Sequence, residues 1–369
     1  MKSGLIKKLI VLILVFDLIM IVYLSNKKPA VSVENAQLDL LPNIRFGLDL
    51  LPSSTINIFS VFEIPTGTPE KTEEPDKEDG SRIMIDVWDE ETGASEMELE
   101  EYVFHVLAGE MPASYEPEAL KAQAVAARTF ALKQLFVGTS CKSGHTVCTC
   151  PNCCQAFADT ETLKRSWGNT YETYCEKLRR AVEETRGEVM TSEGKLISAL
   201  YHASSGGKTE DCEAVFAVAL PYLVSVDSEG EEAFSEYSSD KSFAISDFCN
   251  MVNEAYPQAG LTDPSRQVAI WARTDSGRVK LVQLGGTVIS GQQLRKLLNL
   301  RSTNFTFSFS QDSVTITCLG FGHGVGMSQC GADAMAKQGI GYKQILEHYY
   351  TGIELVDYSQ LKNSRNSDA

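Results

Sequence analysis

The sequence lacks several features that would assign it to common protein classes. Only one long apolar run occurs in its 369 residues, which excludes a polytopic membrane protein. Basic residues are scarce, because beyond Lys28 there are 28 Lys and Arg against 48 Asp and Glu. Such an acidic chain repels nucleic acid, which proteins bind largely through Lys and Arg contacts to phosphates. No internal repeat is visible, and the length suits one large or two modest globular domains rather than a disulfide-stapled miniprotein.

The single apolar run spans residues 9–24 and has two lysines on each side. As a helix it would rise about 24 Å, just enough to cross a bilayer when the lysines reach the headgroups. A cleaved signal peptide is the alternative, but no good A-x-A cleavage site follows the run. We therefore expect residues 1–28 to form a single-pass membrane anchor. Lysines near the N-terminus favour a cytoplasmic N-terminus and an extracytoplasmic body.

The composition beyond the anchor predicts a linker, a globular body and a tail. Residues 29–81 are expected to be the juxtamembrane segment and linker. Within them, residues 65–80 contain three Pro, two Gly and six acidic residues, which is typical of a solvated spacer. The globular body is expected over residues 82–355, and residues 356–369 are expected to be a polar tail.

Hydrophobic periodicity predicts an α+β body, with helices early and a strand-rich remainder. The predicted helices span residues 97–108, 117–135 and 291–298, the last capped by Ser290, and a closing helix includes residues 345–349. The predicted strands span residues 83–88, 196–202, 267–272, 279–282 and 314–318.

Glu110 is a candidate catalytic residue because it lies between an apolar helix end and a Met-Pro turn. If the carboxylate is partly buried, its pKa rises because the charged form is desolvated, and it can then act as a general acid at neutral pH. The alternative is structural: Glu110 caps a helix or pairs with Arg128 or Lys121.

Five of the ten cysteines lie between Cys141 and Cys154, together with His145. This density permits disulfides or a thiolate metal site, and a His among closely spaced cysteines favours zinc. A Cys-His nucleophile pair is a third interpretation, which is disfavoured because cysteines in a metal site are already committed.

Two segments rich in glycine and polar residues suit sugar binding. Residues 201–207 (YHASSGG) lack the G-x-S-x-G elbow of serine hydrolases, and residues 322–326 (GHGVG) lack the G-K-[ST] ending of phosphate loops. Their small residues allow close approach to a ligand, and their hydroxyl, imidazole and amide groups hydrogen-bond sugars. The alternatives are a tight turn and satisfied core histidines. The candidate substrate-binding residues are Tyr201, His202, Ser204, Ser205, Gly206, His323 and Gln329.

Three blocks resemble the stage II sporulation protein D family, which contains bacterial cell-wall lytic transglycosylases and amidase enhancers. They are LEEYVFHVLAGEMPASYEPEALKAQAVAARTFA around Glu110, TRGEV leading to ISALYHASSGGKTE in residues 185–210, and GHGVGMSQ followed by Gly331-Ala332. The resemblance covers about residues 83–353. It implies that Glu110 is the catalytic acid. Glu118, Glu210 and Asp211 are further acidic residues that could stabilise the reaction.

The resemblance implies a membrane-anchored enzyme that cleaves MurNAc-GlcNAc bonds of denuded peptidoglycan strands to 1,6-anhydromuramic products. It further implies action during forespore engulfment, from the mother-cell membrane facing the septal wall. The implied partners are a wall amidase, stage II sporulation protein P, and a polytopic membrane protein, stage II sporulation protein M. The alternatives are a non-catalytic, glycan-binding enhancer of a wall amidase and an extracellular zinc or thiol hydrolase.

The resemblance also implies a structural zinc bound by His145, Cys148 and Cys154. Zinc-binding members of the family use a His ahead of two cysteines that are six residues apart. Here His145 lies only three residues before Cys148, nearer than in the family. The residues that could replace it or complete the shell are Cys141, Cys150 and Cys153.

Overall fold

The computed structural model of the protein describes residues 82–138 and 141–365. The expected anchor and linker, residues 1–81, lie outside the described residues. Within the described ranges, no helix has the length and apolar character needed to cross a membrane. Helices and strands are mixed, in agreement with the predicted α+β class.

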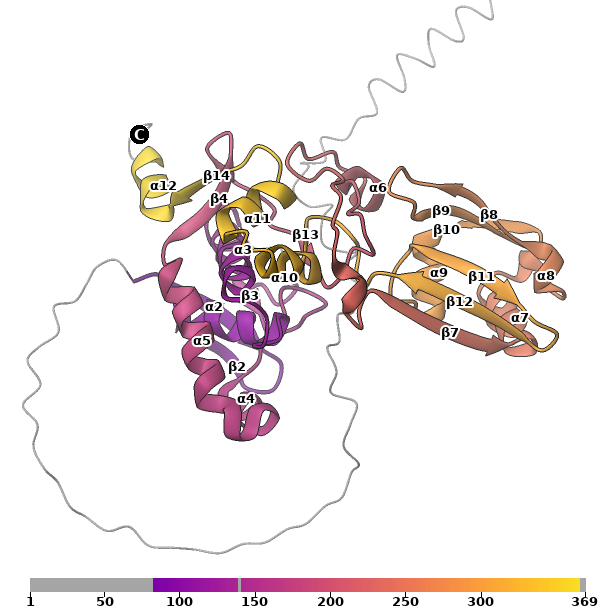
Figure 1. Cartoon of the computed structure of the whole chain (residues 1–369), viewed down its shortest axis with the longest axis horizontal. Helices are drawn as coiled ribbons and strands as arrows, with labels where there is room; N and C mark the ends of the chain where they lie inside the picture. Colours follow the sequence, from indigo (N-terminus) through magenta and orange to yellow (C-terminus); the bar gives the residue numbers. More distant parts are fainter. Residues whose placement is uncertain (1–81, 139–140, 366–369) are drawn as a thin grey trace, which may run out of the picture. The chain divides into compact units, whose positions relative to one another are not determined.

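One hydrophobic core surrounds the long helix α3 (Pro117–Val137), in a part of the chain that we term the helical lobe (residues 82–237 and 320–365). Most alanines of α3 are fully buried, and their small side chains let neighbouring elements approach closely. The elements in contact with α3 include α2 (Leu99–Glu110), α5 (Tyr171–Glu184), β4 (Glu188–Ser192), α10 (Gln329–Lys337) and α11 (Tyr342–Tyr349), as Figure 1 shows. Two shorter helices are α4 (Thr160–Trp167) and α6 (Cys212–Phe216).

Short strands join distant segments of the helical lobe. One sheet has the order β2 (Gly93–Glu98), β1 (Met84–Asp89) and β3 (Val147–Cys148). A second has the order β14 (Glu354–Asp357), β4 and β5 (Lys195–Leu196). In a third, β6 (Tyr201–His202) and β13 (Met327–Ser328) pair in parallel, so the two segments predicted to bind sugar lie side by side.

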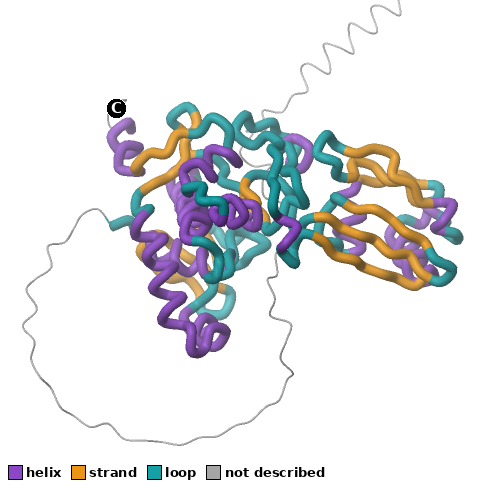
Figure 2. Tube along the Cα trace, in the orientation of Figure 1, coloured by secondary structure: helices purple, strands orange, loops and turns teal. Residues whose placement is uncertain are grey.

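A second hydrophobic core defines the sheet lobe, residues 238–319. Its sheets have the orders β11 (Phe305–Phe309), β12 (Ser313–Leu319), β7 (Ser238–Ala244) and β10 (Thr287–Ser290), β9 (Val279–Leu284), β8 (Val268–Arg273). The accompanying helices are α7 (Ile245–Ala255), α8 (Pro264–Gln267) and α9 (Gly291–Leu298). Figure 2 shows that the longer strands gather in this lobe.

Several predicted elements differ from the structure at their ends. The helix predicted over residues 97–108 starts and ends two residues later, because Met97 and Glu98 pair with β1. The strand predicted over residues 196–202 is wrong as one element, since only its two ends are strands, in β5 and β6. In the expected tail, Val356 and Asp357 pair with β4, and α12 (Tyr358–Arg365) follows. The capped helix 291–298 is confirmed: the Ser290 hydroxyl accepts the Gln293 N–H at 3.1 Å.

Buried polar contacts connect the sheet lobe to the YHASSGG segment. Arg278 is almost fully buried, and its guanidinium donates to the carbonyls of Ser205 at 2.7 Å and Lys208 at 2.9 Å. The hydroxyls of Thr274 and Ser276 donate to Glu210. The turn between β8 and β9 therefore supports the loop that follows β6.

Candidate active site and cysteine centre

Glu110 is the last residue of α2 and is 3% exposed. The helix ends here because Met111 precedes Pro112 and takes an extended backbone, as residues before proline do. A Cβ added at Gly109 would lie 3.0 Å from the backbone of Ala156, so glycine lets that segment pack closely against the helix end. The Ala156 N–H then donates to Glu110 Oε1 at 2.6 Å.

Burial raises the pKa of Glu110 from its ordinary value of 4.5 to about 7. The hydrogen bond from Ala156 and the nearby side chains of Tyr201 and Gln329 oppose this rise in part. Oε2 of Glu110 has no hydrogen-bond partner among the described residues. A carboxyl with a pKa near 7 and one unpartnered oxygen can both give and take a proton at neutral pH.

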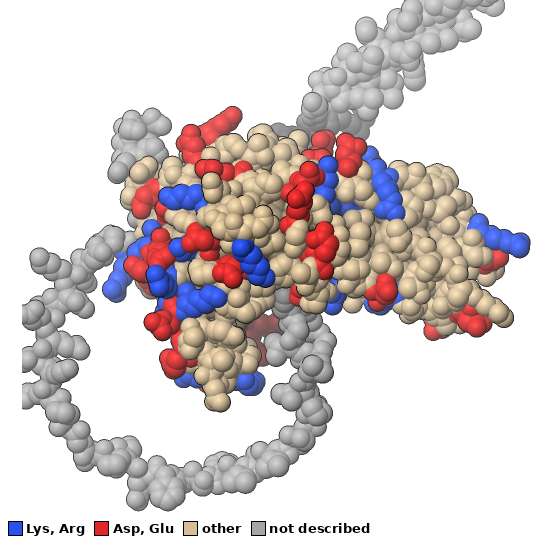
Figure 3. Space-filling view, in the orientation of Figure 1, with Lys and Arg blue, Asp and Glu red and all other residues tan. Residues whose placement is uncertain are grey.

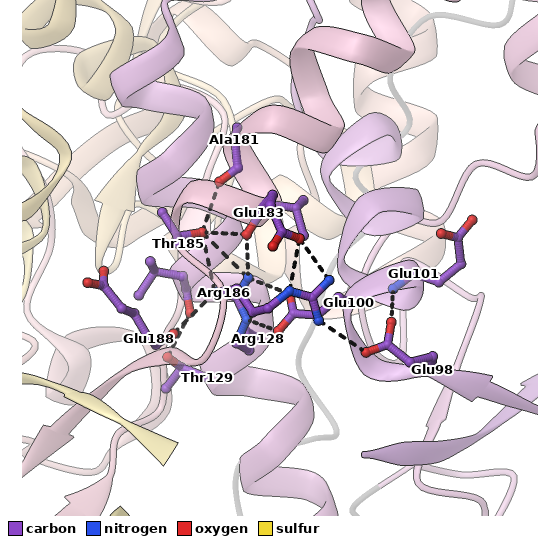
Figure 4. Close-up of polar contacts among 12 residues, drawn as sticks. Glu98, Glu100, Glu101, Arg128, Thr129, Ala181, Glu183, Thr185, Arg186 and Glu188 are labelled. Atoms are coloured by element: carbon purple, nitrogen blue, oxygen red, sulfur yellow. Dashed lines mark hydrogen bonds and ion pairs between the residues drawn. The ribbon is translucent and has the colours of Figure 1, made fainter. Parts of the chain in front are cut away.

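The structural alternative for Glu110 was a helix cap or an ion pair with Arg128 or Lys121, and among the described residues Glu110 forms neither ion pair. Arg128 is fully buried and binds Glu100, with its Nη2 2.6 Å from Oε2 (Figure 4). It also donates to the Glu188 carbonyl, which ties α3 to β4. Lys121 pairs with Glu118 and Glu184. The TRGEV block therefore supports the helices, and Glu110 is left without a cation.

A buried network of tyrosine and glutamine side chains surrounds Glu110. Gln155 donates from Nε2 to the Tyr201 hydroxyl at 2.8 Å and accepts from Tyr102 at 3.4 Å. Because the Tyr201 hydroxyl accepts this bond, its own proton remains available to Glu110. The Gln329 amide donates to Gln123 at 3.4 Å. Gln155 was missed in the sequence, although its position directly after Cys154 was a signal.

Two atoms of the Gln123–Gln329 pair have no partner among the described residues: Gln123 Nε2 and Gln329 Oε1. An unmade hydrogen bond in a buried site costs free energy, so such atoms mark a place for a ligand or water. Together with Glu110 Oε2, the pair offers one donor and two acceptors. Gln123 was also missed, because a single Gln on an alanine-rich helix gives no functional signal.

The two serines of the YHASSGG segment hydrogen-bond inside the protein. Ser204 and Ser205 are buried, and both hydroxyls donate to the fully buried carboxylate of Glu231. Gly206 has a φ of +72°, and a Cβ there would lie 2.7 Å from the Leu319 carbonyl carbon. These residues shape the loop, and direct sugar contact by the two serines stays a prediction.

His202 and His323 are also buried, with ring centroids 5.7 Å apart. His202 Nδ1 lies 3.1 Å from the Val325 carbonyl, and His323 Nδ1 accepts the Val325 N–H at 3.0 Å. Burial lowers the pKa of His202 to about 3 and that of His323 well below its usual range. Both rings are therefore neutral. Nε2 of His202 has no hydrogen-bond partner among the described residues, and sugar contact by the two histidines stays a prediction.

Four cysteines form a cluster whose sulfur atoms lie within 4.8 Å of one another: Cys141, Cys148, Cys153 and Cys154. The sulfurs of Cys141 and Cys153 are 3.7 Å apart, beyond disulfide length and close to the edge of a zinc tetrathiolate tetrahedron. Backbone N–H groups point at the sulfurs of Cys153 and Cys154, both at 3.4 Å. This donor set fits a structural zinc.

His145 is not part of this cluster, in contrast to the predicted ligand set. Its Nδ1 lies 2.6 Å from the Asp86 carboxylate, and its ring stacks on Trp88 with centroids 5.0 Å apart. Cys148 and Cys154 do lie in the cluster, with Cys141 and Cys153 in place of the His. A hydrogen bond from Cys154 lowers the pKa of Cys148 to about 5, which favours the thiolate that a metal requires.

Comparisons with known proteins point to one family. A family model described as stage II sporulation protein matches residues 89–192. Stage II sporulation protein D of Bacillus amyloliquefaciens is 36% identical over 258 residues, which cover 70% of this chain and 74% of the relative. The protein of the same name from Bacillus subtilis (strain 168) is 35% identical over 266 residues, covering 72% and 76%. An amidase enhancer of Bacillus subtilis (strain 168) is 28% identical over 302 residues, covering 69% of this chain and 40% of the enhancer.

Proposed function

Because the chain belongs to the stage II sporulation protein D family, we propose that it is a peptidoglycan lytic transglycosylase that acts in sporulation. The observation that carries the proposal is Glu110, a buried carboxyl with a pKa of about 7 and one unpartnered oxygen. The substrate class is a glycan strand from which the stem peptides have been removed.

One carboxyl suffices for this reaction. Protonated Glu110 gives its proton to the leaving glycosidic oxygen as the bond from that oxygen to C1 of muramic acid breaks. The 6-hydroxyl of the same sugar then forms a bond to C1, and its proton passes to the Glu110 carboxylate. The product is a 1,6-anhydro ring, no water is consumed, and Glu110 returns to its starting state.

Three other acidic residues are committed elsewhere, which supports a one-carboxyl reaction. Glu231 accepts hydrogen bonds from the hydroxyls of Ser204 and Ser205, and Glu210 accepts hydrogen bonds from those of Thr274 and Ser276. Glu118 pairs with Lys121. We assign no second carboxylate a role in the chemistry.

The cysteine centre is proposed to hold the site together. A zinc ion bound by the four thiolates would supply rigidity to a short loop and, with its shell filled, no position for a reacting water. The chain runs from Cys154 directly into Gln155, which orients Tyr201, and Ala156, which binds Glu110. A zinc or thiol hydrolase is disfavoured, because four thiolates bound to zinc would leave neither an open position on the metal nor a free thiol in the cluster.

The cellular setting is proposed from the resemblance. The apolar run at residues 9–24 would anchor the chain in the mother-cell membrane, with the body facing the septal wall. A wall amidase (stage II sporulation protein P) would supply peptide-free strands, and stage II sporulation protein M would be the membrane partner. The name of the amidase enhancer relative supports a second candidate function, a non-catalytic glycan-binding enhancer.

The test is mass spectrometry of peptide-free glycan strands incubated with the full chain in detergent, as wild type and as Glu110→Gln. We expect an anhydro product, one water lighter than a hydrolysed strand, and a rate reduced by about 100-fold to 10,000-fold in the variant. Intact strands that are retained by the wild type would instead establish the enhancer. A melting temperature of the variant that is no lower than that of the wild type excludes loss of the fold.

A further inference from the structure

The sheet lobe has an exposed apolar face that the proposed active site does not use. The described residues contain six exposed large apolar side chains, and three of them lie on the sheet β10-β9-β8. They are Trp271 (59% exposed), Leu281 (38%) and Val288 (37%). A concentration of this kind on one sheet marks an interaction surface rather than scattered surface variation.

The strand register places these side chains on the side of the sheet away from the core. Ile289, Val282 and Ile270 form a row that packs into the second core. Because side chains alternate, the rows on either side of it face outward. These rows are Val288 with Gln283 and Ala269, and Ser290 with Leu281 and Ala272. Trp271 lies at the irregularity between Ile270 and Ala272, and a bulge of this kind re-aims a side chain.

The indole of Trp271 is held in place although it is exposed. Its Nε1–H donates to Gln283 Oε1 at 2.8 Å, and the Gln283 amide donates to the Gly285 carbonyl at 3.1 Å. An aromatic ring that is already fixed loses little conformational entropy when a ligand stacks on it. The face is therefore a preorganised platform with one aromatic ring and an amide at its edge.

The charge of this region differs from the rest of the described chain. Between residues 268 and 290 the only acidic residue is Asp275, in the turn, and the three strands have none. The sheet lobe as a whole has eight basic and six acidic residues, net +2. The helical lobe has 17 basic and 31 acidic residues, net −14, and acidic side chains are frequent over it in Figure 3. Two of the eight basic side chains, Arg278 and Arg295, are buried, so the surface of the sheet lobe is close to neutral and repels a polyanion less than the helical lobe does.

We propose that the outer face of β10-β9-β8 is a docking platform for a peptide-free glycan strand. The identity of the polymer rests on the proposed function. Removal of stem peptides leaves a free lactyl carboxylate on each muramic acid, so the strand is a polyanion with apolar sugar faces. Those faces stack on Trp271, the Gln283 amide lies beside the stacked ring, and the exposed Lys280 offers a cation.

The experiment uses the full chain with Glu110→Gln, so that strands are bound without being cut, labelled with 5-fluorotryptophan. The sequence has three tryptophans, and Trp271→Phe assigns the resonance of Trp271 in the ¹⁹F NMR spectrum. We expect purified peptide-free strands to shift or broaden this resonance more than those of Trp88 and Trp167. A resonance of Trp271 that stays unchanged while strands bind would overturn the proposal, and the face would then be open to a protein partner.

Affinity measurements with fluorescent strands give a second test. Trp271→Ala should weaken binding about tenfold, as loss of a central aromatic contact does. Lys280→Glu should also weaken strand binding, and its effect should be larger at low salt than at high salt. Met84→Ala is the matched control, because Met84 is 48% exposed and lies on β1 of the other lobe. Equal affinities for the Trp271 and Met84 variants contradict the platform.

The outcomes separate the platform from the proposed chemistry. If wild type fails to cut strands but the Trp271 resonance responds to them, transglycosylation is wrong and the platform stands. If strands are cut and Trp271 does not respond, the chemistry stands and the platform is wrong. Melting temperatures of all variants within a few degrees of wild type would show that the exposed substitutions leave the fold intact.

Discussion

The two lobes bury polar groups in different ways. The helical lobe encloses Glu110 and two glutamines with atoms that have no partner. The sheet lobe buries two arginines, Arg278 and Arg295, each with one unpartnered nitrogen, and displays Trp271 on its outside. The helical lobe is strongly acidic and the sheet lobe slightly basic. Reactive groups and surface for binding are thus carried by different parts of the chain. Substitutions in one lobe should change the chemistry, and those in the other only stability or binding.

The largest expected effect concerns the cysteine centre of the helical lobe. Cys153→Ser removes one of four thiolates and should lower bound zinc and the free energy of unfolding by roughly 3 kcal/mol or more, because metal binding contributes directly to folding. His145→Ala should retain zinc, since His145 binds Asp86 instead of the cluster. Zinc per chain is measured by elemental analysis, and unfolding by urea. Loss of zinc from the His145 variant alone would contradict the four-thiolate assignment.

The next effect is the pH dependence of stability that Glu110 causes. Its pKa is about 7 in the folded protein and near the ordinary 4.5 when unfolded. The folded state therefore holds the proton more tightly, so stability falls as pH rises from 4.5 to 7 and then levels off. The total is about 3 kcal/mol. Urea unfolding at pH 4.5 and pH 8 measures this loss. Between the two pH values, the free energy of unfolding of Glu110→Gln should rise by this amount relative to that of wild type. An equal difference at both pH values would refute the raised pKa.

Gln155 tests how the helical lobe positions its acid. Gln155→Met keeps the volume but removes the hydrogen bonds to Tyr201 and Tyr102. We expect cleavage to fall about tenfold. The alkaline limb of the pH-rate profile should move to higher pH, because Tyr201 is no longer oriented by Gln155 and stabilises the Glu110 carboxylate less. When Tyr201→Phe is already present, Gln155→Met should reduce the cleavage rate almost no further. If the two losses in rate are additive, Gln155 does not act through Tyr201.

The smallest effect is expected in the sheet lobe. Ser290→Ala removes the cap of α9 and should cost about 1 kcal/mol of stability. Cleavage per folded molecule should not change, since Ser290 lies outside the helical lobe. The measurements are urea unfolding and the initial cleavage rate. A rate loss as large as that of Gln155→Met would show that the two lobes are not functionally separate.

Local signals in the sequence predicted much of the fold. The cap at Ser290, the apolar periodicity of α2 and α3 and the position of Glu110 at a helix end follow from neighbouring residues. The break between β5 and β6 could not be predicted, because it depends on the parallel pairing of Tyr201 with Met327 across 126 residues. Val356 and Asp357 seemed to begin a tail for the same reason, since their partners lie in β4.

Site residues could be predicted when their type and neighbours in the sequence are distinctive. They could not be predicted when their role depends on contacts with residues far away in the sequence. Glu110 and the cysteine-rich loop were visible in the sequence. That four cysteines form the metal-binding cluster without His145 is visible only in the folded chain. Ser204 and Ser205 looked suited to sugar, yet Glu231, more than 20 residues away, takes both hydroxyls. Gln123 and Gln155 became candidates only through their neighbours.

The most direct test of the central claim is a titration of Glu110 itself. The full chain is labelled with ¹³C at the side-chain carboxyls of glutamate, and the resonance missing from Glu110→Gln is followed from pH 4 to pH 9. We predict a midpoint near 7, as expected for a buried acid that both gives and takes a proton at neutral pH. A midpoint near 4.5 would mean that Glu110 is an ordinary solvated carboxylate, and the one-carboxyl mechanism would then be wrong.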